Sequence, residues 1–290
     1  MTFKSINIIG YGFVGSAIGH LCKRNNVLFN VCDVSNKKDS FQIKVDNVPE
    51  LVKFSEKENN INYYFIAVPT PSNEDYTANV SIVENVLDQL NHNVTKDTYA
   101  IIKSTLCPGS CQMFYEKYKN IKLILCPEFL RESTYKDDIY DAKFVLLGLQ
   151  KDKVYAQTSY NDVIILFRNL YCHNTDIPIY VKSFDECEIF KYSLNVYLAV
   201  KVWYFNEIFE ICDKVGVDYK SLKSLFALDE RIGKYGIEVP GPDGKFGYGL
   251  SCLPKETKGM ASLQDKLGID NTVLKHIIER NNIFREKNIS

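Results

Sequence analysis

The segment GYGLSCLPKE, residues 247–256, places one thiol where it could act as a nucleophile. Gly247 and Gly249 loosen the backbone ahead of Cys252 and let a substrate approach closely. Lys255 follows three positions later, and a neighbouring cation favours the reactive thiolate over the thiol. Such a thiolate can form a covalent intermediate with a substrate. The alternative is a small buried hydrophobe, which is how most free cysteines are used.

Lys191 and Asn195 form a second pair that could do chemistry. They are four residues apart in a region of helical pattern, so they share one face of the expected helix, among Phe, Tyr, Leu and Val neighbours. Together they could stabilise a developing oxyanion. Without further context, a lysine that extends to solvent and a buried amide are the favoured explanation of the pair.

Hydroxyl and carboxylate side chains follow three of the expected strands. Thr70 lies in VPTP (68–71), Thr105 in STLCPG (104–109), and Glu128 and Glu132 in PEFLRE (127–132). Ligands of doubly wound folds bind at the carboxyl ends of strands, so these side chains could hold a cofactor or a water. The alternatives are turn caps for the threonines and surface charges at a helix start for the glutamates.

A glycine fingerprint opens the chain. Gly10, Gly12 and Gly15 fit the spacing GxGxxG between an apolar run and a helical pattern, and Asp33 ends the next apolar run. In this context backbone amides and a helix N-terminus bind pyrophosphate, while the carboxylate binds the ribose hydroxyls and disfavours a 2′-phosphate. The fingerprint therefore predicts NAD, and the alternative is a glycine-rich turn beneath a helix.

Apolar runs that alternate with helical patterns predict the α/β class, with a Rossmann-like, doubly wound and mostly parallel sheet. The expected strands are 5–9, 27–34, 63–68, 99–104, 123–126, 144–149 and 179–182, and helices are expected over 16–24, 80–90 and 161–171. Residues 186–215 lack glycine and proline and predict one central helix of about 45 Å. Shorter helices are expected over 219–228, 255–266 and 272–284. The expected domains are an NAD-binding domain over 1–184 and a helical domain for substrate and dimerisation over 185–290.

Composition favours a globular protein that acts on small molecules. A formal net charge of −1 and a pI near 6.4 give no electrostatic reason to expect nucleic acid or a membrane surface as partner. The nine cysteines lack the spacing of a zinc site and no secretory leader is recognised, so we expect free thiols, no metal and a cytoplasmic location. No apolar run approaches the roughly 20 residues of a bilayer span.

Taken in order, these motifs resemble the UDP-glucose/GDP-mannose dehydrogenase family, and within it the UDP-glucose 6-dehydrogenase group. The resemblance covers nearly the whole chain and rests on residues 10–15, 68–71, 104–105, 127–132, 191 with 195, 231–233 and 251–255. It implies two successive NAD-dependent oxidations of a sugar primary alcohol to the carboxylate, with UDP-glucose giving UDP-glucuronate. It also implies a homodimer through the long helix.

The resemblance assigns roles by motif. Cys252 would add to the aldehyde, and a second oxidation would turn the thiohemiacetal into a thioester. Lys191 and Asn195 would hold the oxyanion, Glu128 would activate the hydrolytic water, Thr105 would hold a water for proton transfer, and the carboxylate of Glu256 would orient the site. Expected cofactor contacts are Gly10, Gly12, Phe13, Val14, Gly15, Asp33, Thr70, Thr105, Glu132 and Lys255. Expected substrate contacts are Phe129, Leu130, Lys191, Asn195, Gly249 and Arg231, the last across the dimer.

Three departures from the family pattern leave other functions open. Glu256 stands where the family has aspartate, Leu250 where it commonly has glycine, and we expect the family's third, nucleotide-gripping domain to be lacking. The alternatives are GDP-mannose or another nucleotide sugar as substrate, and a catalytically weakened module that binds NAD or a partner. A two-electron dehydrogenase of the 3-hydroxyacid type is a further alternative, in which Cys252 would be idle.

Overall fold

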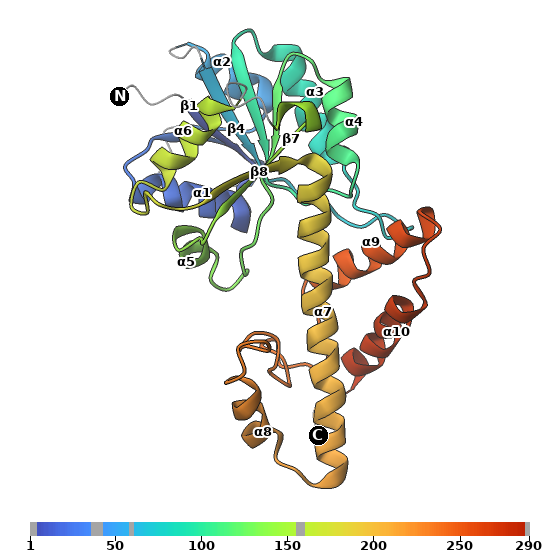
Figure 1. Ribbon diagram of the computed structural model, residues 1–290. Coiled ribbons are helices and arrows are strands. Elements are labelled where there is room, and N and C mark those ends of the chain that lie inside the picture. Colours follow the sequence, from blue (N-terminus) through green and yellow to red (C-terminus); the bar gives the residue numbers. More distant parts are fainter. Residues whose placement is uncertain (1–4, 36–42, 58–60, 155–159, 288–290) are drawn as a thin grey trace. The chain divides into compact units, whose positions relative to one another are not determined.

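The computed structural model describes residues 5–35, 43–57, 61–154 and 160–287 (Figure 1). Contacts divide the chain into two compact units. The first comprises Met1–Pro71 with Asn79–Lys191, and the second comprises Ser72–Ala78 with Tyr192–Ser290. The segment 72–78, which closes with a bridge between Ser72 and Ala78, therefore belongs with the helical part of the chain.

The first unit is built on an eight-stranded sheet in the order β3-β2-β1-β4-β5-β6-β7-β8. All neighbouring strands are parallel except β6 and β7, so the predicted doubly wound, mostly parallel sheet is confirmed. The strands are β1 (Ser5–Ile9), β2 (Phe29–Cys32), β3 (Lys44–Val45), β4 (Ile61–Ile66), β5 (Asp97–Ile102), β6 (Lys122–Leu125), β7 (Val145–Leu149) and β8 (Ile179–Ser183).

Helices cover both faces of this sheet (Figure 1). Strands buried on both sides read as continuous apolar runs, and successive residues of β4 enter opposite cores. Tyr63 and Phe65 pack with α1 and α6, whereas Tyr64 and Ile66 pack with α2, α3 and α4. The helices of this unit are α1 (Phe13–Arg24), α2 (Val48–Ser55), α3 (Ser81–Asn93), α4 (Ser110–Lys117), α5 (Tyr135–Tyr140) and α6 (Asn161–Leu170), with a 3₁₀ turn η1 (Lys151–Lys153).

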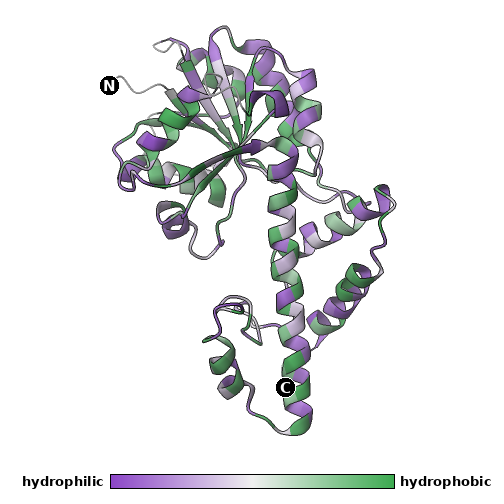
Figure 2. Ribbon diagram, viewed as in Figure 1, coloured by the Kyte–Doolittle hydropathy of each residue, from purple (hydrophilic) through white to green (hydrophobic). Residues whose placement is uncertain are grey.

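The predicted long helix is α7 (Phe184–Val215), 32 residues in length. Its first turns belong to the first unit, where the buried Glu188 carboxylate accepts hydrogen bonds from the backbone of Gly109 (2.6 Å) and Cys111 (2.9 Å) at the start of α4. Hydrophobic and hydrophilic residues alternate along α7 (Figure 2). Among the helices of the described residues, α7 included, none is long and apolar enough to span a membrane.

The second unit consists of the remainder of α7 with α8 (Tyr219–Phe226), α9 (Cys252–Lys266) and α10 (Thr272–Glu286). Its apolar contacts form two small cores, one around Phe205 and Tyr219 and one around Ala199, Tyr248 and Ile277. The helix expected over 255–266 is α9, and its predicted start is wrong, because α9 begins at Cys252. Pro254 lies in the first turn, where a residue without an N–H is tolerated.

Candidate active site

The fingerprint turn is tight at two of its glycines and open at the third. Gly10 has a φ of +85°, and a Cβ there would lie 2.5 Å from the carbonyl oxygen of Ala67. A Cβ on Gly15 would lie 2.0 Å from the carbonyl oxygen of Gly10, whereas a Cβ on Gly12 would meet nothing within 4 Å. The open side of Gly12 lies at the N-terminus of α1, where Phe13 and Val14 form the first turn. This is the geometry that accommodates a pyrophosphate.

Asp33 follows β2 and reaches back to this turn. Its Oδ2 accepts a hydrogen bond from the backbone N–H of Tyr11 (2.5 Å), and its Oδ1 accepts one from the backbone N–H of Ser35 (2.7 Å). The carboxylate expected to bind a ribose hydroxyl therefore lies beside the pyrophosphate turn. These residues fit an NAD adenosine, since a carboxylate here repels a 2′-phosphate.

The loops after β4 and β5 are held together at the carboxyl end of the sheet. Ser104 donates from its hydroxyl to the carbonyl of Val68 (2.7 Å), which joins the stretch before Thr70 to the stretch before Thr105. Thr70 is buried and Thr105 is half-buried. Adjacent parallel strands thus bring the two predicted hydroxyls to the same edge of the sheet.

Glu128 follows β6 and is buried against a lysine that the motifs did not single out. Lys103 Nζ lies 3.1 Å from its Oε2, and the backbone N–H of Phe129 donates to its Oε1 (2.6 Å). Burial alone would lower the pKa of Lys103, but its interactions with Cys126 and Glu128 outweigh burial and raise that pKa above its ordinary value. Lys103 is therefore a buried cation that holds the Glu128 carboxylate in place.

Lys191 lies close to the same loop. Its Nζ donates a hydrogen bond to the carbonyl of Glu128 and lies 5.5 Å from the centre of the Phe129 ring. Leu130 packs against the apolar core on one face of the sheet, and Glu132 is exposed. The first unit therefore brings Glu128, Phe129 and Lys191 together.

In the second unit Cys252 is the half-buried first residue of α9. Its Sγ lies 3.6 Å from the Ser251 hydroxyl, and the half-buried Lys255 follows in the first turn. One turn further on, the fully buried Glu256 accepts a hydrogen bond from the amide of Asn195 at 2.6 Å. The hydrogen bond between α7 and α9 thus lies one helical turn after Cys252.

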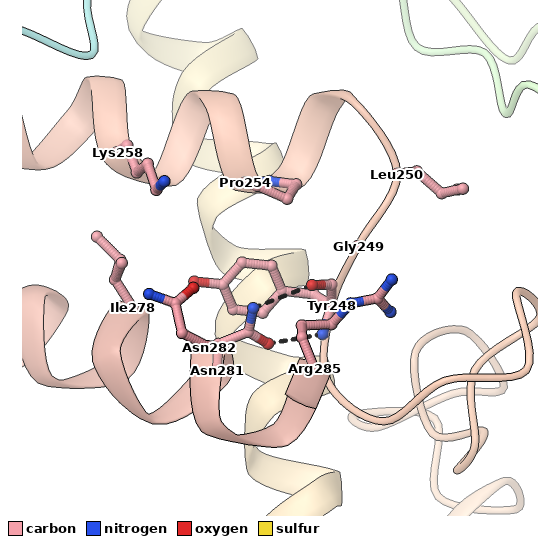
Figure 3. A pocket seen from close by; sticks show the side chains of 9 residues that line it. All are labelled: Tyr248, Gly249, Leu250, Pro254, Lys258, Ile278, Asn281, Asn282 and Arg285. Carbon is pink, nitrogen blue, oxygen red and sulfur yellow. Dashed lines mark hydrogen bonds between the residues drawn. The ribbon is translucent and has the colours of Figure 1, made fainter. Parts of the chain in front are cut away.

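The loop before Cys252 carries two distinctive residues. Leu250 has a φ of +61° and an exposed side chain, an unusual conformation for any residue other than glycine. Gly249 lies against the guanidinium of Arg285. Both border a pocket of about 190 Å³ that is lined by Tyr248, Gly249, Leu250, Pro254, Lys258, Ile278, Asn281, Asn282 and Arg285 (Figure 3).

Arg231 follows α8 in the second unit. It is exposed and forms a two-pronged ion pair with Asp229 (2.9 and 2.5 Å). The described residues contain no group of three or more His, Cys, Asp or Glu side chains that could hold a metal ion. All nine cysteines are free.

The parallel sheet, the glycine turn at the start of α1 and the carboxylate after β2 define a dinucleotide-binding α/β protein of the dehydrogenase type. Comparison with known families is more specific. The NAD-binding domain of the UDP-glucose/GDP-mannose dehydrogenase family matches residues 42–167, and the central domain of that family matches residues 185–283.

Individual relatives agree with these matches. A UDP-glucose 6-dehydrogenase from Rickettsia typhi is 30% identical over 96% of this chain and 67% of its own length, and one from Campylobacter jejuni is 32% identical over 97% and 72%. The structure of a UDP-glucose dehydrogenase from Pyrobaculum islandicum is also similar, with a TM-score of 0.77 and 22% identity. The match covers 97% of this chain and 68% of the Pyrobaculum chain.

The chain belongs to the UDP-glucose/GDP-mannose dehydrogenase family. It is thus a member of a family of NAD-dependent oxidoreductases, and the predicted family, enzyme class and cofactor are confirmed. The chain spans about two thirds of the length of the relatives described above.

Proposed function

We propose that this protein oxidises the primary alcohol of a nucleotide sugar to the carboxylate in two steps, with UDP-glucose as substrate and UDP-glucuronate as product. One observation carries the proposal. Cys252 begins α9, and Glu256, one turn later, binds the amide of Asn195. A covalent route needs a thiol whose neighbours are held in place, and these two helices provide that support.

The covalent role falls to Cys252. After the first oxidation its thiolate adds to the aldehyde carbon and gives a thiohemiacetal, which the second oxidation converts to a thioester. Water then cleaves the thioester, so the acid is released and the thiol is regenerated. NAD, when bound, accepts one hydride in each oxidation. Gly12, Val14 and Asp33 would hold it through its pyrophosphate and ribose, with Thr70, Glu132 and Lys255 as further contacts.

The other candidate catalytic residues would move protons and stabilise charge. Lys191 and Asn195 would donate to the oxyanion of the tetrahedral intermediate, which is the largest electrostatic requirement of such a reaction. Glu128, held by Lys103, would activate the hydrolytic water, and Thr105 would hold a water for proton transfer. Phe129, Leu130, Gly249 and Arg231 would contact the nucleotide sugar.

The test is NADH formation from UDP-glucose and NAD, followed at 340 nm and calibrated against the acid produced. We expect two NADH for each acid and loss of acid formation in Cys252→Ser. One NADH per substrate, with no effect of thiol alkylation, would support a two-electron dehydrogenase instead. NAD binding by calorimetry without turnover of UDP-glucose, GDP-mannose or any other nucleotide sugar would support a binding module.

We also propose a homodimer through α7. Tyr197, Tyr204 and Ile211 are exposed apolar residues at intervals of seven, so they form a stripe along one face of this helix. A second copy of the chain is the occupant that would bury it, since a stripe repeating every seven residues pairs with an identical stripe. Tyr204→Glu should convert a dimer into a monomer in sedimentation velocity, whereas Tyr235→Glu, an exposed tyrosine elsewhere, should not.

A further inference from the structure

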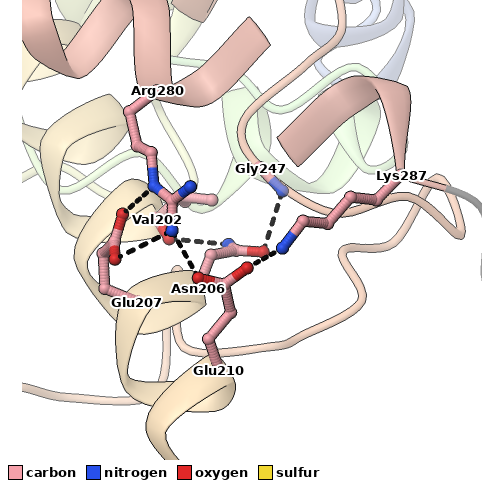
Figure 4. Close-up of polar contacts among 7 residues, drawn as sticks. All are labelled: Val202, Asn206, Glu207, Glu210, Gly247, Arg280 and Lys287. Atoms are coloured by element: carbon pink, nitrogen blue, oxygen red, sulfur yellow. Dashed lines mark hydrogen bonds and ion pairs between the residues drawn. The ribbon is translucent and has the colours of Figure 1, made fainter. Parts of the chain in front are cut away.

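The loop that leads into Cys252 is fixed by two buried asparagines. Asn206 of α7 accepts a hydrogen bond from the backbone N–H of Gly247 (2.8 Å), and its own amide donates to the carbonyl of Val202 (2.8 Å). Asn281 of α10 accepts from the backbone N–H of Tyr248 (2.7 Å) and donates to the carbonyl of the same residue (3.0 Å). The latter pair is visible in Figure 3, and the bond to Gly247 in Figure 4.

These hydrogen bonds provide partners for buried backbone N–H and C=O groups. Gly247 and Tyr248 are both buried, and a buried N–H or C=O without a partner costs about 1–3 kcal/mol. A side-chain amide carries one acceptor and donors in the geometry of a peptide group, so Asn281 pairs with Tyr248 as a neighbouring strand would. The two asparagines therefore determine where this short stretch of backbone lies.

The fit leaves no room for adjustment at Gly247. Its φ is +71°, and a Cβ there would lie 2.5 Å from Oδ1 of Asn281 and 3.1 Å from Cβ of Phe284. The Tyr248 ring is buried in the small core with Ala199 and Ile277. Backbone and side chain of this stretch are thus both held, four residues before the thiol.

The two helices that carry the asparagines are themselves joined. Arg280, next to Asn281, forms ion pairs with Glu207 (2.7 Å) and Glu210 of α7, and Lys287 also contacts Glu210 (Figure 4). Glu207 is in turn the neighbour of Asn206. Each asparagine is therefore flanked by a member of this ionic network, which keeps α7 and α10 in register around the loop.

We propose that Asn206 and Asn281 are positioning residues for Cys252. They act through the Gly247–Tyr248 backbone, from which Gly249, Leu250 and Ser251 extend to the first residue of α9. The inference rests on the proposed function, in which Cys252 is the covalent nucleophile. A displacement of the thiol by about 1 Å is enough to lower the rate of a covalent step by about two orders of magnitude.

The test compares Asn206→Ala and Asn281→Ala with Asn271→Ala. Asn271 is also buried in the second unit, and its amide donates to the carbonyl of Ala261 in α9 (2.8 Å). We expect the first two variants to lower kcat for the nucleotide sugar by at least about tenfold with KM changed by less than about threefold. Asn271→Ala should keep kcat within about twofold at a similar loss of Tm.

A second readout does not depend on activity. The rate of iodoacetamide alkylation at Cys252, measured by peptide mass spectrometry, should rise in the two loop variants, because a released loop exposes the half-buried thiol. The exposed Cys172 of the first unit serves as an internal reference whose rate should stay constant. If Asn281→Ala does not fold, Asn281→Ser replaces it, since serine keeps one hydrogen-bonding atom. Its alkylation rate at Cys252 should lie between those of the wild type and Asn206→Ala.

Two outcomes would overturn the inference: equal effects in Asn271→Ala, or unchanged alkylation of Cys252 in the loop variants. A wild-type protein that oxidises no nucleotide sugar would instead contradict the proposed function. Alkylation would still report on the positioning of Cys252 in that case.

Discussion

The side-chain amide of Asn195 donates to the Glu256 carboxylate at 2.6 Å, and the carboxylate is fully buried. A buried carboxyl oxygen without a hydrogen-bond partner would be costly, and this bond provides one. It joins the middle of α7 to the first turns of α9, and thereby to the helix that begins with Cys252.

Replacing this amide with a carboxylate should destabilise the protein in a pH-dependent way. In Asn195→Asp two carboxylates face one another, and both cannot be ionised there without a large cost. We expect the free energy of unfolding, measured in urea, to fall by about 2–4 kcal/mol at pH 8 and by less at pH 5, where one carboxylate takes up a proton. Asn282→Asp, on the exposed side of α10, is the control and should be nearly neutral at both values.

Two glycine substitutions in the fingerprint should separate binding from stability. A methyl on Gly12 meets nothing within 4 Å, so Gly12→Ala should keep the Tm of the free protein but weaken NAD binding at least about tenfold by occupying the space for pyrophosphate. Gly15→Ala should lower the Tm itself, since its methyl would lie 2.0 Å from the Gly10 carbonyl. Calorimetric titration with NAD and a thermal melt measure both. Unchanged NAD affinity in Gly12→Ala would contradict the assignment of this turn.

The buried pair of Lys103 and Glu128 should behave differently from an exposed pair. Lys103→Met leaves a buried carboxylate without its counter-ion and should reduce the free energy of unfolding by about 3–5 kcal/mol. Adding Glu128→Gln should recover most of this loss. Lys117→Met breaks the exposed pair with Glu84 and should cost far less, because solvent screens an exposed pair. Urea unfolding of the four proteins forms the comparison, and equal losses for the two lysines would argue against a buried charge at Lys103.

Glu188 should make the protein less stable as the pH rises towards neutrality. Burial raises the pKa of Glu188 to about 7 from 4.5, although the N–H groups of Gly109 and Cys111 act in the opposite direction. The folded protein thus keeps a proton that the unfolded chain has lost, and the stability from this difference is complete below pH 4.5 and disappears as the pH rises through 7. Relative to Glu188→Gln, the wild type should lose about 3 kcal/mol of unfolding free energy between pH 4 and pH 8.

The exposed Glu186 provides the matched control for Glu188. Hydrogen bonds from Ser183 lower the pKa of Glu186, so Glu186→Gln should change the pH dependence with the opposite sign. A wild-type stability curve parallel to that of Glu188→Gln would show that Glu188 titrates normally.

Leu250→Gly should be tolerated or stabilising. A left-handed backbone costs a non-glycine residue about 1–2 kcal/mol, and the Leu250 side chain is 70% exposed, so little burial is lost on its removal. Glycine's own entropy in the unfolded chain offsets part of this, which leaves a gain of up to about 1 kcal/mol. Leu267→Gly, at an equally exposed position with a φ of −89°, should instead be destabilising. Differential scanning calorimetry distinguishes these outcomes.

Local signals in the sequence predicted much of the sheet and the cofactor turn. The apolar strands and the spacing of Gly10, Gly12 and Gly15 depend on nearby residues, so their positions could be predicted without knowledge of tertiary contacts. The short elements β3, α2, α4 and α5 were not predicted, because their few residues give a weak periodic signal.

Partners distant in the sequence could not be predicted in the same way. Lys103 and Glu128 lie at the ends of β5 and β6, and only the strand order places their side chains 3.1 Å apart. From the sequence alone, Asn206 and Asn281 resemble surface positions on their helices. Only the structure shows that their side chains bind the Gly247–Tyr248 backbone. Both cases depend on how separate elements pack, which a single sequence does not encode locally.

The double attachment of Asp33 has a consequence for redesign of the coenzyme preference. Exchanging this carboxylate for a neutral or basic side chain is the obvious way to admit a phosphorylated ribose. Here the same exchange would also remove the acceptors of the Tyr11 and Ser35 N–H groups and so loosen the turn that receives the pyrophosphate. An engineered switch would therefore need a replacement acceptor for Tyr11 as well as a new cation for the phosphate.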